Sequence, residues 1–313
     1  MPTRRIAAIV PCHNEAISIG KVVADLREAL PTAVVYVYDN LSSDGTAEVA
    51  LAAGAVVRRE DNKGKGNVLR RAFADIDADV YVLIDGDDTY DAFAAPQMIE
   101  TLISGPYDHV LGVRKEEAES TTAYRPGHSL GNSAFNFIVS FLFRQRVNDM
   151  LSGYRVFSRR FVKSFPALSR EFEIETELTV HSLSLRIPQT EFEVGFRDRA
   201  EGSESKLNTT RDGARILGVV INLLRHERPI LYHGVISVVL AIVALVIGIP
   251  VIVDFYQTGL VSRFPTAFLA ASLIVLSVTI LFFGLVLEAN KRLRHETARL
   301  HYLALSPVNG DSE

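Results

Sequence analysis

The sequence predicts an α/β domain built on a mostly parallel sheet, followed by a hairpin of two transmembrane helices. Two observations lead to this prediction. Short apolar runs alternate with helical patterns over the first 115 residues, which is typical of a parallel sheet covered by helices on both faces. Farther along, Pro229–Val253 and Phe264–Leu287 lack charged residues and exceed the roughly 20 residues that cross a bilayer core.

The predicted elements of the domain alternate along the chain. Strands are expected at Arg5–Val10, Val34–Tyr38, Ala55–Arg58, Asp79–Ile84 and His109–Val113. Helices are expected at Ser18–Leu30, Gly45–Ala53, Gly66–Ile76 and Ala94–Ser104, with later helical patterns at Leu130–Phe143 and Glu171–Leu185. The basic aromatic stretch Phe157–Phe165 suits either a membrane interface or ordinary packing within the domain.

Composition narrows the class of protein. The chain has 313 residues, 48% of them hydrophobic, and a formal net charge of −4. This near-neutral balance argues against nucleic-acid binding, which usually shows a basic surplus. The single cysteine, Cys12, cannot form an internal disulfide. The apolar run Ile6–Val10 is too short for a signal peptide, so we interpret it as a buried first strand.

We divide the chain into a globular domain at 1–206, a juxtamembrane amphipathic helix at 207–228, a hairpin at 229–288 with spans 229–253 and 264–288, and a tail at 289–313. Two buried core helices are the alternative to the hairpin, but a soluble core seldom needs two all-round apolar helices this close together. Basic residues flank the outer ends of the hairpin, whereas the connection holds only Arg263. The positive-inside rule therefore predicts a cell-membrane protein whose domain and both termini face the cytosol.

The strongest chemical signal is Asp85-Gly86-Asp87-Asp88, directly after an apolar strand. Three carboxylates in four residues repel one another unless a cation joins them. Mg²⁺ and Mn²⁺ often bind through one or two carboxylates together with substrate phosphates, so Asp85 and Asp87 are candidate metal ligands. Gly86 would let the backbone turn closely around the ion. A solvated acidic turn is the alternative.

Three further polar motifs follow predicted strands or precede a helix. Pro11-Cys12-His13-Asn14-Glu15 follows the first strand, and Asp39 begins a polar segment after the second. In a parallel sheet, ligands bind beyond the carboxyl ends of the strands, so Asp39 is a candidate acceptor for a base or ribose. Asp44 suits a helix N-cap. Lys65 lies in a glycine-lysine loop before a helix, where it can meet an anion, although the loop matches no Walker A or dinucleotide fingerprint.

Together the motifs resemble glycosyltransferase family 2, and within it the polyprenyl-phosphate sugar synthases typified by dolichyl-phosphate mannose synthase. They occur in the family's order between Ile6 and Lys206: PCHNE, YDNLSSDGT, NKGKGN, DGDD, NDMLSGYRVFS and RAEGSESK. The resemblance implies a GT-A-type, Rossmann-like domain. It also implies an inverting transfer of one sugar from a nucleotide sugar to a polyprenyl phosphate, with Mg²⁺ or Mn²⁺, in cell-envelope glycan synthesis. Asn40 departs from the family pattern, which usually has a second aspartate there, and so does Asp88-Thr89-Tyr90.

The resemblance also assigns roles to residues. The donor would be bound by Pro11, Asn14, Glu15, Asp39, Lys65, Asp85, Gly86 and Asp87, and the acceptor phosphate by Arg114, Arg125, Arg155 and Lys206. Asp149 resembles the acidic residue assigned as base or as acceptor-orienting group. Because the second pKa of a phosphate monoester is about 6, a lipid phosphate is mostly deprotonated at neutral pH. We therefore expect Asp149 to orient Arg155 or Arg125 rather than to act as a base.

Two alternatives remain open at this stage. The acceptor could be a glycan, a glycolipid or a protein, or the chain could be a non-catalytic membrane subunit that binds a nucleotide sugar. The sequence has no tryptophan and so lacks the Q-x-x-R-W signature of processive synthases, which favours a single transfer. The expected partners are the donor, the lipid acceptor and membrane lipids, while the donor nucleotide (UDP or GDP) and homo-oligomerisation stay open.

Overall fold

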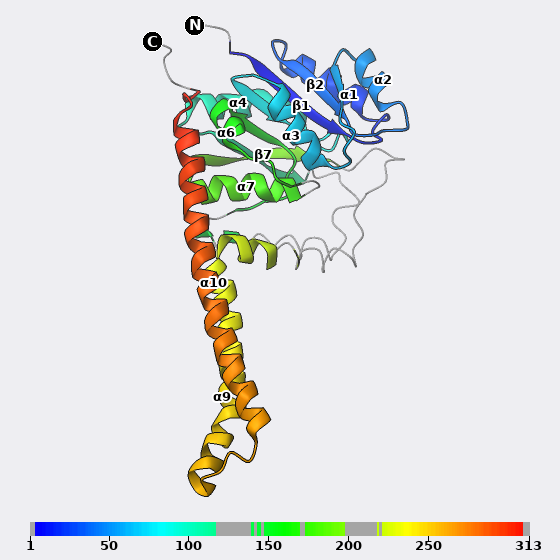
Figure 1. Cartoon of the computed structure of the whole chain (residues 1–313). Helices are drawn as coiled ribbons and strands as arrows, with labels where there is room; N and C mark the ends of the chain where they lie inside the picture. Colours follow the sequence, from blue (N-terminus) through cyan, green and yellow to red (C-terminus); the bar gives the residue numbers. More distant parts are fainter. Residues whose placement is uncertain are drawn as a thin grey trace. The chain divides into compact units, whose positions relative to one another are not determined.

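The computed structural model describes residues 4–116, 139–140, 143–144, 147–169, 173–197, 218 and 221–308. Its residues fall into two compact units, labelled by element in Figure 1. The first unit comprises the described residues within Met1–Gly213 and Ala298–Glu313, and the second those within Ala214–Thr297. The last described residues of the chain, from Ala298 onwards, therefore belong to the first unit.

A seven-stranded sheet forms the centre of the first unit, in the order β3-β2-β1-β4-β6-β5-β7. The strands are β1 (Ile6–Cys12), β2 (Val34–Asp39), β3 (Val56–Arg59), β4 (Val80–Leu83), β5 (His109–Glu116), β6 (Arg155–Ser158) and β7 (Gln189–Phe196). The strands β1 to β4 run parallel, and β5 pairs in parallel with β7. Only β6 is reversed, lying antiparallel to both β4 and β5. The prediction of a mostly parallel sheet is confirmed.

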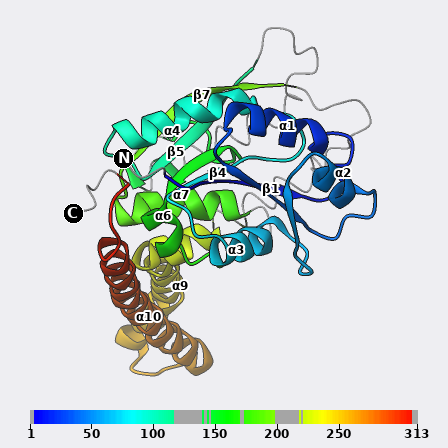
Figure 2. The same ribbon diagram turned by 90° about the horizontal axis from the view of Figure 1, so that it is seen from above.

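Helices cover both faces of this sheet, as the view in Figure 2 shows. One core contains α1 (Ile19–Ala29), α2 (Thr46–Ala52) and α4 (Ala95–Ser104), preceded by the short η1 (Ala92–Ala94). The other contains α3 (Lys65–Asp75), α6 (Arg159–Ser164), α7 (Glu173–Leu185) and the end of α10. Along β1, Ala8 and Val10 enter the first core while Ala7 and Ile9 enter the second. This two-residue alternation follows from strand geometry, and burial of both faces explains the apolar run.

The elements predicted over the first 115 residues are all present, with ends that differ by at most three residues from those predicted. The structure adds β6 and β7, which the sequence did not predict. All four side chains of β6 are buried, as is Phe161 in α6, so Phe157–Phe165 packs within the domain. The predicted helix at Glu171–Leu185 corresponds to α7, whereas most of Leu130–Phe143 lies outside the described residues.

The second unit holds two long helices, α9 (Pro229–Thr258) and the greater part of α10 (Phe264–Leu303). Both are long and apolar enough to cross a membrane, so they are candidate spans. The Ser237 and Ser277 side chains meet between them, with 2.9 Å separating their hydroxyl oxygens. Residues 221–227 of the predicted juxtamembrane helix are helical. The helix α10 continues beyond residue 288, the predicted end of the second span, because 289–303 contains no glycine or proline that would end it.

Candidate active site

The polar motifs meet at the carboxyl ends of β1, β2 and β4. Cys12 is the register partner of Asp39, and Pro11 of Tyr38. Cys12 is buried, and burial raises the pKa of its thiol well above the usual value. Nearby carboxylates raise it further, from Glu15, Asp85, Asp39 and Asp87. The thiol therefore stays protonated at neutral pH, and the four predicted acidic residues gather around the end of β1.

Gly86 lies against this cysteine. A Cβ added at Gly86 would stand 2.5 Å from Cys12 Sγ, which is too close for any side chain. The Gly86 carbonyl also accepts a hydrogen bond from Ser18 Oγ at 2.7 Å. The glycine is thus required by packing against β1 and α1, a reason that the sequence did not reveal.

Asn14 ties the loop after β1 to the loop after β2. Its side-chain oxygen accepts from Ser43 N at 2.9 Å, and its backbone N–H donates to Ser42 Oγ at 2.9 Å. Glu15 N donates to Thr46 Oγ1 at 2.9 Å. These contacts hold the two loops together and fix the backbone of Asn14 and Glu15 beside Asp39.

Asp44 has a structural role, although Gly45 and not Asp44 is the N-cap of α2. Its carboxylate accepts hydrogen bonds from Ala16 N at 3.0 Å and from Thr46 N at 3.1 Å. Burial alone would raise the pKa of Asp44, but the bonds from Thr46 and Ala16 outweigh burial and lower it.

Asp39 and Asn40 end β2 with opposite roles. Asp39 is 7% exposed, its Oδ2 accepts from Ser42 N at 3.3 Å, and its buried Oδ1 has no hydrogen-bond partner. Asn40 instead donates to the carbonyls of Glu60 and Asn62 and accepts from Gly64 N at 2.6 Å. An aspartate could not donate to those carbonyls, which explains the departure from the family pattern. Asn40 thus stabilises the loop before α3, and one carboxylate oxygen of Asp39 remains available to a ligand.

The acidic motif after β4 is joined to a buried lysine. Lys65 Nζ donates to Asp85 Oδ1 at 2.5 Å and lies 2.6 Å from Glu175 Oε1. Burial lowers the pKa of Lys65, but the two carboxylates outweigh this and hold it above the ordinary value. Burial also raises the pKa of Glu175, with Lys65 opposing the rise. Asp87 is 6% exposed and accepts from Thr89 Oγ1 at 2.7 Å.

Glu175 is a residue that sequence reasoning missed. A signal was present, because Glu175, Leu178, Thr179 and Ser182 share helical spacing and are all buried. A glutamate on the buried face of a helix requires a cationic partner. The partner, Lys65, had already been singled out, so the pair could have been proposed from the sequence.

A divalent metal fits this edge only with help from a ligand. Among the residues that the structure describes, no group of three or more His, Cys, Asp or Glu side chains is placed to hold a metal ion alone. Asp85 and Asp87 offer carboxylates from one strand end. Mg²⁺ and Mn²⁺ commonly complete such a pair with phosphate oxygens and water. The donor set therefore suits a metal that arrives with a diphosphate.

Asp149 forms a bidentate ion pair with Arg114, with Nε–Oδ2 and Nη2–Oδ1 distances of 2.6 and 2.7 Å. Asp149 is 4% exposed, and the Arg114 guanidinium lies 5.3 Å from the centre of the Phe196 ring. The expectation that Asp149 orients Arg155 or Arg125 is thus wrong for Arg155, since its partner is Arg114. Both carboxylate oxygens are engaged, which leaves Asp149 poorly placed to accept a proton.

The predicted contact of Arg155 with an acceptor phosphate is wrong in this structure. Arg155 is wholly buried, and its guanidinium donates to Ser152 O, Thr179 Oγ1 and Met150 O at 2.9, 2.8 and 2.7 Å. All of its nitrogens are turned inward. Arg155 therefore stabilises the loop at 149–153 from its buried side. Arg125 and Lys206 lie outside the described residues.

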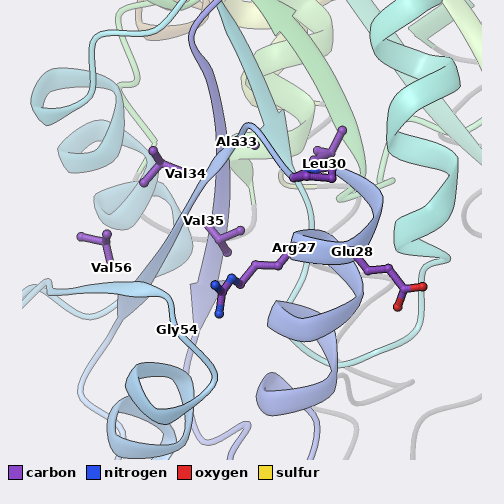
Figure 3. A pocket seen from close by; sticks show the side chains of 9 residues that line it. Arg27, Glu28, Leu30, Ala33, Val34, Val35, Gly54 and Val56 are labelled. Carbon is purple, nitrogen blue, oxygen red and sulfur yellow. The ribbon is translucent and has the colours of Figure 1, made fainter.

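A shallow pocket elsewhere is not the candidate site. It lies between the end of α1 and the starts of β2 and β3, lined by side chains such as Arg27, Val34 and Val56 (Figure 3). This is the opposite end of the strands from Asp39 and Asp85. Its lining includes no residue predicted to act on a donor or an acceptor among those the structure describes.

Comparison with known proteins agrees with this geometry. Residues 7–165 match the family model Glycosyl transferase family 2. Glycosyltransferase AglJ of Haloferax volcanii is 33% identical over 304 residues, which cover 95% of this chain and 97% of that protein. A dolichyl-phosphate hexose transferase of the same organism is 28% identical over 71% of this chain and 95% of its own length.

A solved structure shares the fold. The glucosyl-3-phosphoglycerate synthase of Mycobacterium tuberculosis, crystallised with Mn²⁺, uridine-diphosphate-glucose and phosphoglyceric acid, superposes with a TM-score of 0.58 at 22% identity. The match covers 71% of this chain and 79% of that one. The first unit thus has a GT-A-type fold, and the chain belongs to glycosyl transferase family 2.

Proposed function

We propose that this glycosyltransferase moves one sugar from a nucleotide sugar to a polyprenyl phosphate, with inversion at the anomeric carbon and with Mg²⁺ or Mn²⁺. The observation that supports this most strongly is the edge formed by Asp39, Asp85 and Asp87. One buried oxygen of Asp39 has no protein partner, and two carboxylates follow β4. A nucleoside diphosphate has ribose hydroxyls that can donate to Asp39. Its phosphate oxygens can complete the coordination of a metal ion held by Asp85 and Asp87.

The name of one relative supports a lipid phosphate as the acceptor. The Haloferax dolichyl-phosphate hexose transferase is named for a lipid phosphate, and this chain covers 95% of its length. In the proposed reaction an acceptor phosphate oxygen bonds to the anomeric carbon, and the bond from that carbon to the diphosphate oxygen breaks. The bonding electron pair leaves with the nucleoside diphosphate. A bound metal supplies charge neutralisation to that leaving group.

Arg114 and Asp149 serve the acceptor side in this proposal. The Arg114 guanidinium is fixed by two hydrogen bonds to Asp149, so its charge is presented in a defined orientation. A phosphate monoester with a second pKa of about 6 is already mostly deprotonated at neutral pH. Asp149 then contributes by orienting Arg114 and does not need to remove a proton.

The candidate spans suit an anchor for a lipid-borne substrate. Many apolar side chains of α9 and α10 are exposed, such as Ile242 at 54% and Phe282 at 64%, which suits contact with lipid. Basic residues flank the outer ends of the pair: Arg225, Arg228, Lys291, Arg292 and Arg294. We propose that both ends of the hairpin face the cytosol, where nucleotide sugars are available.

A donor panel tests the proposal. Purified full-length protein is given a polyprenyl phosphate, Mg²⁺ or Mn²⁺, and labelled UDP-glucose, UDP-N-acetylglucosamine or GDP-mannose. We expect one donor to place label in the organic phase, from which mild acid releases it. Transfer to a glycan, glycolipid or protein would assign the alternative acceptor instead. Absence of turnover with every donor and acceptor would favour a non-catalytic binding subunit.

A further inference from the structure

We propose that Glu175 is a positioning residue for the metal site, holding Lys65 so that its ammonium does not neutralise Asp85 when a divalent cation binds. This inference rests on the metal-dependent transfer proposed above. It assigns a role to a buried carboxylate of α7 that the reaction itself does not touch.

The geometry places the lysine between two carboxylates. Lys65 Nζ lies 2.5 Å from Asp85 Oδ1 and 2.6 Å from Glu175 Oε1. The Lys65 and Glu175 side chains are 8% and 6% exposed, whereas Asp85 is 28% exposed. Asp85 is therefore the member of the trio that a soluble ion can reach, and Glu175 can influence it only through Lys65 or through the electric field.

The charges of the trio explain why a second carboxylate is needed. A lone Lys65–Asp85 pair has no net charge and would offer a cation little attraction. With Glu175 ionised, the three side chains carry one net negative charge. Because water is largely excluded around Lys65 and Glu175, these interactions are less screened than at the surface. Glu175 thus restores to Asp85 the anionic character that Lys65 alone would cancel.

The hydrogen bonding of Glu175 indicates more than a structural role. Its Oε2 is buried and has no hydrogen-bond partner. An unsatisfied buried acceptor destabilises the folded state. A carboxylate that served packing alone would be better replaced by an amide or an apolar side chain. Its charge is the property that the structure uses.

The loop after Asp149 fixes the other side of Asp85. A Cβ at Gly153 would stand 2.2 Å from Asp85 Oδ2. Gly153 N also donates to the Tyr90 hydroxyl at 2.9 Å, which locks the glycine in place. Asp85 is thus confined between the Lys65 ammonium and the Gly153 backbone, so its carboxylate has little freedom to escape a competing lysine by rotating.

Metal binding without turnover tests this proposal. The affinity of full-length protein for Mn²⁺ is measured from the electron paramagnetic resonance signal of free Mn²⁺, with UDP or GDP present and no acceptor. E175Q keeps the size and removes the charge, and we expect it to raise the Mn²⁺ Kd on the order of tenfold. E177Q, on the same helix but bonded to Leu168 N and Ser169 N, is the matched control and should leave the Kd unchanged.

Two further variants test whether Glu175 changes the Mn²⁺ affinity through Lys65 and through its charge. In a K65Q background, E175Q should change the Mn²⁺ Kd by less than about twofold, because no ammonium competes for Asp85 and the buried Glu175, without its cationic partner, takes up a proton and becomes neutral. E175D keeps the charge and should stay within about threefold of wild type. The inference is overturned if E175Q matches wild type, if its effect is the same in K65Q, or if E175D loses as much as E175Q.

The same titration separates this inference from the proposed function. If wild-type protein binds no Mn²⁺ with either nucleotide, the metal-dependent function itself is contradicted. If wild type binds Mn²⁺ and E175Q binds it equally well, only the role of Glu175 is contradicted. Circular dichroism of E175Q confirms that a weaker Kd does not come from unfolding.

Discussion

At the amino end of β5, Asp108 accepts hydrogen bonds on both carboxylate oxygens, whereas at the carboxyl end of β2 one oxygen of Asp39 has no partner. Asp108 receives Ser158 Oγ and Arg160 Nε on Oδ1, and Tyr302 OH on Oδ2, each at 2.6 Å. Both aspartates are buried. An aspartate therefore has hydrogen bonds on both carboxylate oxygens at the amino end of the sheet, which we call the saturated end. At the carboxyl end, which we call the functional end, an aspartate keeps one oxygen without a protein partner.

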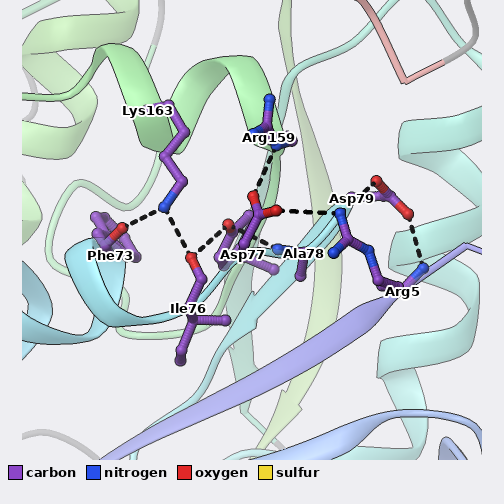
Figure 4. A network of polar contacts seen from close by, with 9 residues as sticks. Arg5, Phe73, Ile76, Asp77, Ala78, Asp79, Arg159 and Lys163 are labelled. Atoms are coloured by element: carbon purple, nitrogen blue, oxygen red, sulfur yellow. Dashed lines mark hydrogen bonds and ion pairs between the residues drawn. The ribbon is translucent and has the colours of Figure 1, made fainter.

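Other charges at the amino end follow the saturated pattern. Figure 4 shows Asp77 bonded to Arg5 and Arg159, with Arg5 N also donating to Asp79. The Lys163 ammonium donates to two backbone carbonyls, those of Phe73 and Ile76, at 2.6 and 2.7 Å. Such contacts join neighbouring elements of the fold. Buried carboxylates with an open oxygen, Asp39 and Glu175, therefore mark the functional end.

The largest expected effect on sugar transfer comes from a substitution at the functional end. D87N should lower sugar transfer by at least about a thousandfold, because the amide is a weak metal ligand and the leaving diphosphate loses several kcal/mol of stabilisation. The thermal unfolding midpoint should change little. Initial rates and circular dichroism of the same preparation check both halves. A variant that keeps a tenth of the wild-type rate would contradict the assignment of Asp87.

The saturated end should respond in the opposite way. D108N breaks a buried ion pair with Arg160 and should destabilise the first unit by about 3 kcal/mol, while the transfer rate per folded molecule stays near wild type. Thermal unfolding and the fraction of active protein are measured together. If D108N lost transfer without losing stability, the assignment of a purely structural role to Asp108 would be contradicted.

Asp149 lies at the functional end, but both of its carboxylate oxygens are hydrogen-bonded to Arg114. D149N should lower transfer about a hundredfold by releasing Arg114 from its orientation. The shape of the pH–rate profile should not change, since no proton acceptor has been removed. If wild type shows an ascending limb near pH 6–7 and D149N lacks it, Asp149 acts as a base and the orienting role is wrong.

The smallest effect concerns His109, beside Asp108. Burial lowers the pKa of His109 well below its ordinary value, and nearby Arg155 lowers it further, against the hydrogen bond that the ring Nδ1 donates to Gln189 Oε1. The folded protein therefore keeps the ring neutral, while the unfolded chain takes up a proton below pH of about 6.5. Stability should fall as the pH drops through this value, by up to about 1.4 kcal/mol per pH unit.

H109Q tests this pH dependence. It removes the titrating ring, so the variant should lose less stability than wild type between about pH 7 and pH 5.5. Unfolding free energies at the two pH values provide the comparison. Equal losses in the two proteins would show that His109 does not contribute to acid sensitivity.

Much of the functional end could be predicted from the sequence because its motifs are local. A short apolar strand followed at once by Asp39 or by Asp85-Gly86-Asp87 places the polar residues at a known edge of a parallel sheet. Strand pairings and side-chain contacts between residues far apart in the chain could not be predicted from local motifs. β6 has only four residues, and its pairing joins Val80 to Ser158.

The partners of individual charges depend on the same long-range geometry. Asp149 pairs with Arg114, 35 positions earlier, and Asp108 with Tyr302, 194 positions later. The role of Asn40 depends on carbonyls of Glu60 and Asn62, which no sequence pattern displays. These side chains could be recognised as important, but the groups that they contact appear only in the folded chain.

Transfer of labelled sugar to a polyprenyl phosphate, measured before and after metal removal, tests the proposed reaction itself. If Asp85 and Asp87 hold a diphosphate-bound cation at the functional end, acid-labile label appears in the organic phase, disappears with chelator and returns with Mn²⁺ or Mg²⁺. Undiminished transfer in the presence of chelator would contradict the account.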